Sequence, residues 1–595
     1  MTASAGPSFL GVEHSWSGRR WRARAYDERL ALALAQRLGA PELIGRVLAG
    51  RSVGVEECET FLEPRLRDCL PDPGRLRDMD AAADRIARAV TAGERIAVFG
   101  DYDVDGATAS ALLRRFLAAA GAPARVYIPD RVAEGYGPNA PALLRLQGEG
   151  VTLVVTVDCG TTAFEPLAAA AAAGLDVVVI DHHVAEARLP EAVAVVNPNR
   201  IDEAPGLGHL AAVGVTFLLI VAVNRALRRA GWYGGSRPEP DLLQWLDLVA
   251  LGTVCDMVPL TGLNRALVAQ GLRVLAGRGN AGLNALAEVA GLRRRSDAYA
   301  LGFILGPRVN AGGRLGQADL GSRLLSSDDP AEALEIARML ERHNDDRRAV
   351  EAAVLEEAIA QVEEAGAGVP PVLFAVGEGW HPGVIGIVAS RLTERFARPS
   401  CVISMTGGVG KASGRSVPGV ALGPAVIAAR QAGLLLAGGG HDMAAGFTVA
   451  GGRLDALRRF LTERLATQAA VAAAAPSLDL DGAVTPAAAT IDLARQLERI
   501  GPYGSGHAEP RLAVPGARLA RADLVGEGHV RMILAGAGGG RLKAIAFRCA
   551  DTPLGESLLR HGGMPVHLAG WLRIDHWNGS ESVQLVVSDA APAGP

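Results

Sequence analysis

Short, nearly continuous apolar runs separated by helix-favouring stretches dominate the middle of the chain. The runs "ERIAVFG" (94–100), "VTLVVTV" (151–157) and "DVVVI" (176–180) show little alternation between apolar and polar positions. An alanine-rich stretch at 164–173 lies between the last two. Strands of this kind are typical of a parallel sheet that is covered by helices on both faces. The pattern predicts an α/β domain at residues 86–325.

A long polar helix is expected after this domain, within a connecting segment at 326–368. Residues 330–364 contain no glycine and begin with the pair Asp329-Pro330, which is typical of a helix start. A helix of about 35 residues would be on the order of 50 Å long. Such a rod is suited to joining two domains.

The remainder of the chain predicts further domains. A second α/β domain is expected at 369–465, and an alanine-rich linker at 466–476. Short strands at 477–595, with the hairpin signal Asn578-Gly579, favour a small barrel of the OB-fold type. Residues 1–85 are predicted to be a segment of short helices with an exposed basic patch, "RRWRAR" (19–24).

Composition narrows the functional classes. The chain has 595 residues, of which 49% are hydrophobic, and a net charge of −4, which disfavours bulk polyanion binding but allows a local basic channel. The six cysteines form no C-x-x-C pair, which fits a reducing cytoplasm. We find no secretion signal, and the longest apolar run, at 210–223, is too short to span a membrane. A soluble cytoplasmic protein without membrane attachment is expected.

Acidic and imidazole side chains follow the ends of the apolar segments. Ligands of parallel sheets bind beyond the carboxyl ends of the strands. Carboxylates gathered there repel one another unless cations lie among them. The sequence therefore predicts a divalent metal site. Its candidate residues are Asp101, Asp103, Asp105, Asp158, Asp181, His182, His183 and Asp256.

The spacing of these residues suggests two ions. Asp103 and Asp105 point their side chains differently, so each can serve one ion, and Asp158 is placed to bridge. Mixed carboxylate and imidazole ligands suit Mn²⁺ better than an all-oxygen Mg²⁺ site. Two ions about 3.5–4 Å apart would stabilise an in-line attack on phosphorus. Taken alone, "DYDVDG" (101–106) is equally typical of an aspartate-rich turn, and the other segments favour the metal site.

These motifs resemble a known superfamily. "DYDVDG", "VDCG", "IDHH" and "GTVCDMVPL" resemble the four motifs of the DHH phosphoesterases. "PDRVAEGYG", "GPRVNAGGRLG", "GWHPGVIGIVASRL", "ASGRS", "GGGHDMAAGFTV" and "GPYGSGHAEP" further resemble the RecJ family of bacterial single-stranded-DNA exonucleases. The likeness extends from about residue 60 to about residue 590. It implies DHH, DHHA1 and OB-fold domains, dependence on Mn²⁺ or Mg²⁺, and digestion from the 5′ end to 5′-mononucleotides.

The resemblance also implies roles for single residues. Asp181 is implied to orient a histidine and His183 to contact phosphate or the leaving group, so that these two and Asp158 are the catalytic candidates. Smaller superfamily members often have a histidine where Phe99 stands, which leaves open whether Asp101 is a ligand. The residues that resemble metal ligands are Asp103, Asp105, Asp158, His182 and Asp256, with Asp101 as a further candidate.

A pocket for the 5′ phosphate is implied as well. Its residues come from distant segments of both α/β domains, so we expect them to meet only in a cleft between the domains. His441 follows three glycines, whose exposed amides could form an anion site. The substrate-binding candidates are Arg131, Arg308, Asn310, Arg314, Ser413, Arg415 and His441.

Three functions compete at this point. The first is an exonuclease on single-stranded DNA in repair, recombination and mismatch repair, acting as a monomer, with single-strand-binding protein and a helicase as candidate partners. The second is a hydrolase of short RNAs, cyclic dinucleotides or pyrophosphate, but such relatives are usually short two-domain chains. The third is a non-catalytic scaffold, which the intact ligand set disfavours. The barrel and the connecting helix favour the first.

Overall fold

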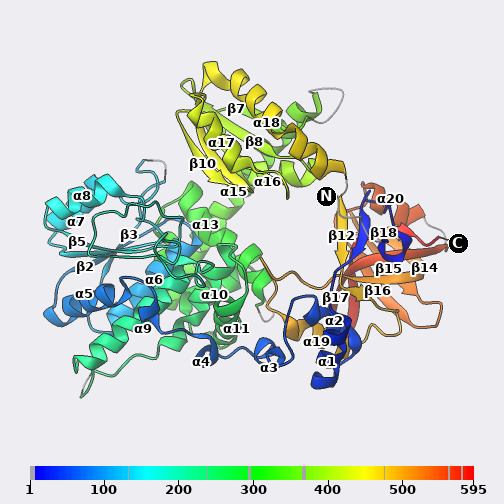
Figure 1. The fold of residues 1–595 in the computed structure, drawn as a ribbon, viewed down its shortest axis with the longest axis horizontal. Helices are drawn as coiled ribbons and strands as arrows, with labels where there is room; N and C mark the ends of the chain where they lie inside the picture. The colour runs from blue at the N-terminus through cyan, green and yellow to red at the C-terminus, as the bar shows by residue number, and fades with distance from the viewer. Residues whose placement is uncertain are drawn as a thin grey trace. The chain divides into compact units, whose positions relative to one another are not determined.

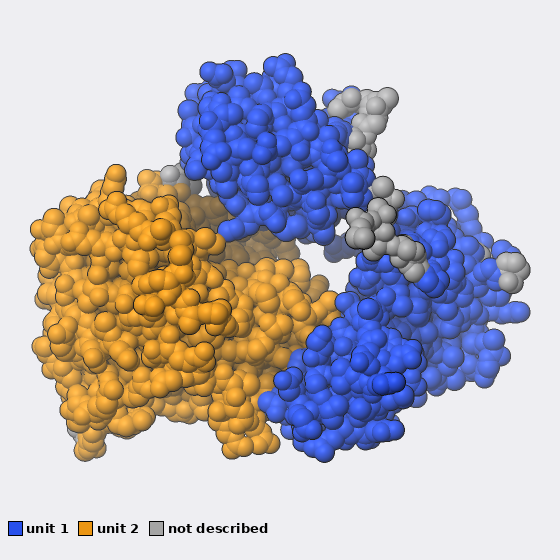
Figure 2. Space-filling view, viewed as in Figure 1, with its two compact units in different colours: residues 1–63, 350–501, 509–595 blue, residues 64–349, 502–508 orange. Residues whose placement is uncertain are grey.

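The computed structural model describes residues 7–131, 133–235, 237–292, 296–364, 370–474, 476–560, 563–577 and 580–594. These residues form two compact units, coloured separately in Figure 2. One unit comprises residues 64–349 and 502–508, and the other comprises residues 1–63, 350–501 and 509–595. Among the described residues, no helix combines the length and the apolar character needed to cross a membrane.

A five-stranded sheet organises the unit of residues 64–349 (Figure 1). Its order is β3-β2-β4-β5-β6, and every neighbouring pair is parallel. The strands are β2 (Ile96–Gly100), β3 (Arg125–Tyr127), β4 (Leu153–Val157), β5 (Asp176–Ile180) and β6 (Ala194–Val196). The predicted parallel sheet is confirmed.

Helices cover both faces of this sheet. Successive residues of a strand point to opposite faces, so both kinds of position are buried. Val98 of β2 packs in a cluster with residues of α5 (Met79–Ala92), α6 (Val104–Ala119) and α9 (Ala212–Arg229). Its neighbour Phe99 packs in a second cluster with residues of α7 (Ala140–Gly148) and α8 (Phe164–Ala172). The continuous apolar runs in the sequence therefore reflect burial on two sides.

Further helices complete this unit. They are α4 (Leu66–Cys69), η2 (Pro73–Arg75), η3 (Leu242–Trp245), α10 (Leu246–Cys255), α11 (Gly262–Ala276), α12 (Ala281–Val289), the π-helix η4 (Ala300–Leu305), α13 (Gly306–Leu315) and α14 (Leu320–Ser326). Helix α15 (Pro330–Glu364) then runs for 35 residues into the other unit. The predicted connecting helix is confirmed.

The segment after α15 folds around a second five-stranded sheet of order β10-β11-β9-β8-β7. Only the pair β7–β8 is parallel, and the other pairs are antiparallel. The elements are β7 (Leu373–Glu378), α16 (Ile385–Phe396), β8 (Ser400–Thr406), β9 (Val409–Arg415), α17 (Leu422–Gln431), β10 (Ala437–His441), β11 (Ala444–Ala450), η5 (Gly451–Arg453) and α18 (Leu454–Ala474). One face packs on α17 and α18, and the other packs on α16 and the end of α15.

The prediction of an alanine-rich linker at 466–476 is wrong for most of its length. Helix α18 continues to Ala474, and Ala469 is 2% exposed in the cluster that covers the second sheet. Alanine has the highest helix propensity of all residues. The alanine-rich run therefore continues helix α18, whose earlier residues are packed against the second sheet.

The C-terminal strands close into a barrel. The order β14-β15-β16-β18-β17 closes through an additional pairing of β14 with β17. The elements of this region are β12 (Ser477–Leu480), β13 (Gly482–Ala483), α19 (Ile491–Ile500), β14 (Leu512–Val525), β15 (His529–Ala535), β16 (Arg541–Ala546), α20 (Pro553–Arg560), β17 (Pro565–Trp577) and β18 (Ser580–Pro592). The predicted barrel is confirmed. The turn residues 578 and 579 lie outside the described part, but the strands that flank them pair as a hairpin.

The N-terminal segment differs from its prediction. It holds η1 (Phe9–Gly11), α1 (Glu28–Leu38), α2 (Glu42–Ala49) and α3 (Cys58–Leu62), but its basic patch forms strand β1 (Arg20–Ala23), parallel to β12. Trp21 in this strand is 0% exposed, and its indole N–H donates to the Asp589 carboxylate at 3.0 Å. The patch therefore alternates, with the buried Trp21 between a partly exposed Arg20 and an exposed Arg22.

Candidate active site

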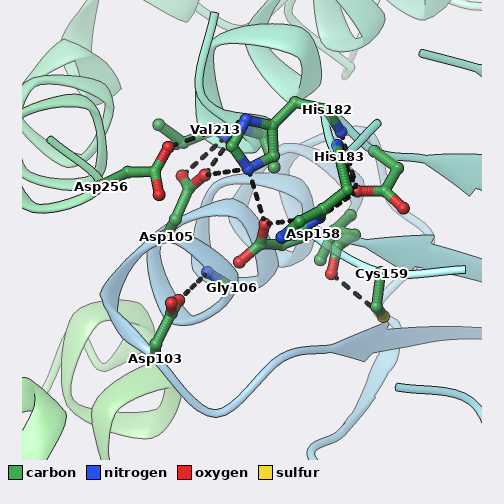
Figure 3. A network of polar contacts seen from close by, with 12 residues as sticks. Asp103, Asp105, Gly106, Asp158, Cys159, His182, His183, Val213 and Asp256 are labelled. Atoms are coloured by element: carbon green, nitrogen blue, oxygen red, sulfur yellow. Dashed lines mark hydrogen bonds and ion pairs between the residues drawn. The ribbon is translucent and has the colours of Figure 1, made fainter. Parts of the chain in front are cut away.

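Acidic and imidazole side chains gather at the carboxyl ends of the parallel strands (Figure 3). Asp101 and Asp103 follow β2, Asp158 follows β4, His182 and His183 follow β5, and Asp256 follows α10. Three groups of ligand atoms each lie within 4.8 Å of one another. These groups are Asp158, His182 and His183; Asp105, His182 and Asp256; and Asp101, Asp103 and Asp158. The structure thus brings all the predicted metal-binding candidates together.

The first two aspartates of helix α6 are positioned by helix ends. Asp103 is the N-cap of α6, and its carboxylate accepts from the Gly106 N–H at 3.1 Å. Asp105 is buried, and its two oxygens accept from the backbone N–H groups of Ala212 and Val213 at 2.6 and 2.9 Å. These N–H groups begin helix α9, where a negative charge is favoured. Asp105 is therefore held rigidly by α9.

Asp158 has a strained backbone in the middle of the cluster. Its φ of 62° lies in the left-handed region, which a non-glycine residue rarely adopts. Its carboxylate is buried, with Oδ1 3.3 Å from the Nε2 of His182. Asp158 belongs to two of the three groups, as expected for a bridging ligand.

His182 presents one ring nitrogen to the acids. Its Nδ1 lies 3.1 Å from the Leu210 carbonyl oxygen, which fixes that nitrogen as the N–H donor. Nε2 then carries a lone pair, and it lies 3.3 Å from Asp158 and 3.9 Å from Asp105. Burial and the neighbouring His183 lower the pKa of His182 to about 4. A neutral imidazole with a free Nε2 is the form that binds metal.

Local donors bind both oxygens of Asp181, which belongs to none of the three groups of ligand atoms. Oδ2 accepts from the Thr161 N–H at 3.0 Å, and Oδ1 accepts from the His182 N–H at 2.8 Å. Oδ1 also lies 2.7 Å from the Nδ1 of His183. Burial alone would raise the pKa of Asp181, yet the hydrogen bond and charge of His183 hold it below its usual value. Asp181 is thus placed to orient His183.

His183 is the more exposed of the two histidines. Burial acts to lower its pKa, but the hydrogen bond and charge of Asp181 raise it overall. Figure 3 shows the two histidines side by side, and their ring centroids are 4.6 Å apart. The pKa of His182 is thus lowered and that of His183 is raised, so the two adjacent rings differ in their tendency to bind a proton.

The other buried carboxyl groups of the cluster repel one another. Burial, followed by the charge of Asp103, raises the pKa of Asp101 to about 8 and that of Asp105 to about 7. Burial, followed by the charge of Asp105, raises the pKa of Asp256 to about 9. The same causes raise the pKa of Asp158 well above its ordinary value. Such mutual repulsion is relieved when divalent cations lie among the carboxylates.

Unpartnered oxygens give an independent test of metal binding. Buried carboxylate oxygens of Asp101, Asp158 and Asp256 have no hydrogen-bond partner among the described residues. A buried oxygen without a donor is costly in a folded protein. The three atoms come from three different segments of one cluster, and oxygen donors with imidazole match Mn²⁺ or Mg²⁺ chemistry. The residues present therefore fit a divalent metal centre.

Sequence reasoning missed a tyrosine and two asparagines beside the cluster. The Tyr136 hydroxyl donates to the Asp158 carbonyl at 3.0 Å and lies 3.3 Å from the Nδ1 of His183. Asn197 donates to the His183 carbonyl, and Asn199 donates to the His182 carbonyl. Tyr136 stands in the motif "PDRVAEGYG", so its signal was present, but the asparagines carry none that distinguishes them from turn residues.

Two of the predicted substrate contacts lie near the cluster. The Arg131 guanidinium lies 5.0 Å from the centre of the Tyr102 ring. Arg131 and Arg314 both act to lower the pKa of Tyr102, although burial and Asp101 raise it to about 12. Helix α13 also approaches closely, since a Cβ on Gly313 would lie 2.4 Å from the Tyr102 carbonyl oxygen. Arg131 and Arg314 therefore share the surroundings of the acids.

Arg308 is placed differently from its prediction. It is 6% exposed, and its guanidinium donates to both carboxylate oxygens of Glu341 and to the Ile304 carbonyl. Because these bonds hold α15 against α13, the geometry favours a structural role over the predicted substrate contact. Asn310 is half-buried on α13, and its substrate role stays a prediction.

The remaining predicted contacts lie on the second sheet. Arg415 ends β9, and its Nη1 donates to the Ser413 hydroxyl at 3.1 Å. Burial lowers the pKa of Arg415. A Cβ on Gly386, in the first turn of α16, would lie 3.0 Å from the Ser413 Oγ and 3.2 Å from the Arg415 Nη2. A guanidinium, a hydroxyl and a helix N-terminus thus share one place, which is favourable for an anion.

His441 is exposed at the end of β10. The preceding Gly440 has φ 150°, and a Cβ there would lie 2.3 Å from the Ala444 carbonyl oxygen. The glycine is required by this close approach between β10 and β11. The anion site predicted at its backbone stays a prediction.

The fold and the site define a class. Parallel strands that end in clustered aspartates and adjacent histidines are those of the DHH proteins, and residues 95–253 match the DHH family, N-terminal domain. Residues 370–467 match the DHHA1 domain, and residues 480–589 match the RecJ OB domain.

Comparison with whole proteins specifies the family. The chain is 36% identical over 564 residues to the single-stranded-DNA-specific exonuclease RecJ of Dickeya dadantii (strain 3937), covering 93% of this chain and 96% of that protein. It also matches the crystal structure of RecJ in complex with Mn²⁺ from Thermus thermophilus, with a TM-score of 0.78 and 31% identity, over 96% of this chain and 79% of the other. The Mg²⁺ complex of the same protein matches with a TM-score of 0.72 and 29% identity, over 96% and 78% of the two chains. The chain belongs to the RecJ family.

Proposed function

We propose that this protein is a metal-dependent exonuclease that degrades single-stranded DNA from the 5′ end to 5′-mononucleotides. The observation that carries the proposal is the buried cluster of carboxylates and histidines with three unpartnered oxygens at the strand ends. The names of the relatives and the metal ions in their structures support the substrate and the cofactor. Repair, recombination and mismatch repair are the processes that such an activity would serve.

Two ions of Mn²⁺ or Mg²⁺ would be held by this cluster. The proposed ligands are Asp101, Asp103, Asp105, Asp158, His182 and Asp256. When bound, the metal would supply Lewis acidity toward a phosphodiester and make water more acidic. The chain provides the rigid positions: the start of α9 fixes Asp105, and the Leu210 carbonyl fixes the tautomer of His182.

His183 and Asp181 have a different proposed role. Asp181 favours the protonated form of His183, since its hydrogen bond and charge raise the pKa of the histidine. A protonated imidazole donates to a phosphate oxygen or to the leaving group. Tyr136 positions this ring through its contact with Nδ1. The division of labour is that His182 binds metal and His183 binds substrate.

A 5′ terminal phosphate is the second element of the proposed substrate. It is a dianion that forked guanidinium donors bind well. Arg131 and Arg314 lie near the acids, while Ser413 and Arg415 form an anion-favouring group with the start of α16. Recognition of a chain end would release one nucleotide per cycle.

The cellular setting is proposed on the same basis. We place the protein in the cytoplasm as a monomer, with single-strand-binding protein and a helicase as candidate partners that supply and expose single strands. These assignments follow from the activity and rest on no contact in the structure.

Digestion of end-labelled DNA tests the activity. A single strand labelled at its 5′ end should release labelled mononucleotide first in the presence of Mn²⁺. The matching duplex should stay intact, and a chelator should abolish release. Release of label from the 3′ end first, or equal digestion of the duplex, would contradict the proposed polarity or strand specificity.

Substitution of Arg415 tests end recognition. A hydrogen bond to a charged group contributes about 1.5–3 kcal/mol, so Arg415→Ala should raise the KM for 5′-phosphorylated strands roughly ten- to a hundredfold. The KM for 5′-hydroxyl strands should change much less. Arg391 on the same helix as Gly386 is exposed and pairs with Glu394, so Arg391→Ala is the matched control. An equal loss on both kinds of end would make Arg415 a general backbone contact.

A further inference from the structure

An exposed aromatic pair lies on the element that packs against the end of α10. Tyr299 and Phe303 are 55% and 62% exposed. Their rings stack, with centroids 4.9 Å apart and an angle of 27° between the planes. Phe303 lies in the π-helix η4, and Tyr299 directly precedes it. Contiguous exposed rings are typical of a binding surface.

Close packing connects this π-helix to the metal-binding cluster. A Cβ on Gly302 would lie 3.3 Å from Val254, and a Cβ on Gly306 would lie 2.4 Å from the Cys255 Sγ. Val254 and Cys255 are the two residues before Asp256, whose Oδ2 lies 3.7 Å from a ring nitrogen of His182. The glycines thus bring the backbone of η4 directly against the segment that supplies a proposed ligand.

The π-helix has a local cause. Pro307 has no N–H to donate to the preceding turn. Gly306 keeps a helical conformation before this proline, with φ −55° and ψ −47°, because it has no Cβ to clash with the proline ring. Single π turns are frequent at functional sites. The aromatic pair therefore stands on an irregular turn that the sequence maintains at the edge of the cluster.

We propose that Tyr299 and Phe303 form a platform on which bases of the substrate single strand stack. The inference rests on the proposed function of the chain as a single-strand exonuclease. Every base has a π face, so stacking on aromatic rings is independent of sequence, as an exonuclease that removes any nucleotide requires. The rings are already paired, so little side-chain freedom remains to be lost on binding.

The position of the pair fits a strand that leads to the acids. Helix α13 continues directly from η4 and carries Arg314 beside Tyr102. Phe303 and Arg314 are separated along the helix axis by about 16 Å. That span corresponds to about five stacked nucleotides. The platform would hold bases a few nucleotides from the reacting end.

Binding of single strands without divalent metal tests the platform. The full-length protein in EDTA is titrated into a fluorescent dT oligonucleotide with a 5′ phosphate, followed by anisotropy. Tyr299→Ala and Phe303→Ala should each weaken binding about tenfold. Phe303→Trp should retain affinity, whereas Phe303→Leu, which keeps an apolar side chain without a π face, should lose it.

Oligonucleotides with abasic sites at successive positions distinguish base stacking on the two rings from a general loss of binding. A pair of abasic sites moved along the strand should weaken wild-type binding at one or two positions, and Phe303→Ala should be insensitive at those same positions. Leu243→Ala is the matched control, because Leu243 is 52% exposed just before the opposite end of α10. Wild-type affinity in both alanine variants, or an equal loss on normal and abasic strands, would overturn the platform. Failure of the wild-type protein to digest single strands in the presence of Mn²⁺ would instead contradict the proposed function.

Discussion

Replacement of Asp158 by asparagine tests two properties of the acid cluster, namely metal binding and the repulsion between its carboxylates. Asp158 belongs to two of the three groups of ligand atoms, and its Oδ1 has no hydrogen-bond partner among the described residues. Asparagine keeps the size of the carboxyl group but removes its charge. Asp158→Asn should therefore reduce metal binding and turnover, and at the same time relieve repulsion in the metal-free protein.

The size of both effects follows from burial and charge. Asp158 is 2% exposed, and burial with the charges of Asp103 and Asp105 raises its pKa well above the ordinary value. A carboxyl group whose pKa is raised in the folded state binds its proton more tightly than the unfolded chain does, so the metal-free fold loses stability as the pH rises. Loss of a shared metal ligand removes several kcal/mol of transition-state stabilisation, so turnover should fall at least about a thousandfold.

The pH dependence gives the sign of the stability effect. The folded pKa is raised, so the folded state binds the proton more tightly than the unfolded state does. Stability of the metal-free wild type is therefore lost as pH rises above about 4 toward the raised pKa. Asp158→Asn escapes this loss, so its melting temperature should exceed that of the wild type by a few degrees at pH 8. The difference should close near pH 4.

Calorimetry in EDTA and single-turnover nuclease assays with Mn²⁺ measure these effects. Asp84→Asn is the control, because Asp84 is 63% exposed on α5 and pairs only loosely with Arg229 at 3.5 Å. A lower melting temperature of Asp158→Asn at pH 8 would refute the repulsion argument. Near-normal turnover, in protein free of host nucleases, would refute the role of Asp158 in metal binding.

Two further predictions concern the histidines and the N-terminal strand. His182→Ala should weaken Mn²⁺ affinity and turnover together, whereas His183→Ala should lower turnover with Mn²⁺ affinity near that of wild type; equal losses in calorimetric titrations would make both residues ligands. Trp21→Ala should destabilise the barrel by about 3–5 kcal/mol, because it removes a fully buried indole and leaves the Oδ2 of Asp589 without its indole donor. Thermal unfolding of the barrel and its resistance to proteolysis measure this loss, and an unchanged transition would mean that β1 is dispensable for the barrel.

Local signals in the sequence were sufficient for the framework. Continuous apolar runs predicted parallel strands buried on both faces, since a strand with two covered faces has no polar position to alternate. The same runs predicted the place of the acids, because parallel strands end at one edge of a sheet. A glycine-free polar stretch predicted α15. Each of these predictions depends on the residue pattern along a single strand or helix.

The substrate-contact candidates came from the resemblance of the motifs and not from the periodicity of the sequence. Nothing in local pattern distinguishes Arg314 from Arg308, and both were predicted to contact substrate. The structure places Arg314 near the acids and pairs Arg308 with Glu341. Their difference arises from which side of α13 faces α15, a property of packing between helices.

Long-range packing decided the rest. Strand β1 pairs with β12, and their residues Arg22 and Asp479 are 457 positions apart in the chain. An isolated "RRWRAR" carries no information about that partner, so it was predicted to be an exposed patch. The positive φ of Asp158 and the contact of Tyr136 with His183 likewise exist only once separate strand ends meet. The sequence by itself determined which residues are candidates for the chemistry and on which elements they lie, because these depend on local period and residue type. The distances, tautomers and burial that set their charge states were decided by tertiary packing, because they depend on groups that only the folded chain brings together.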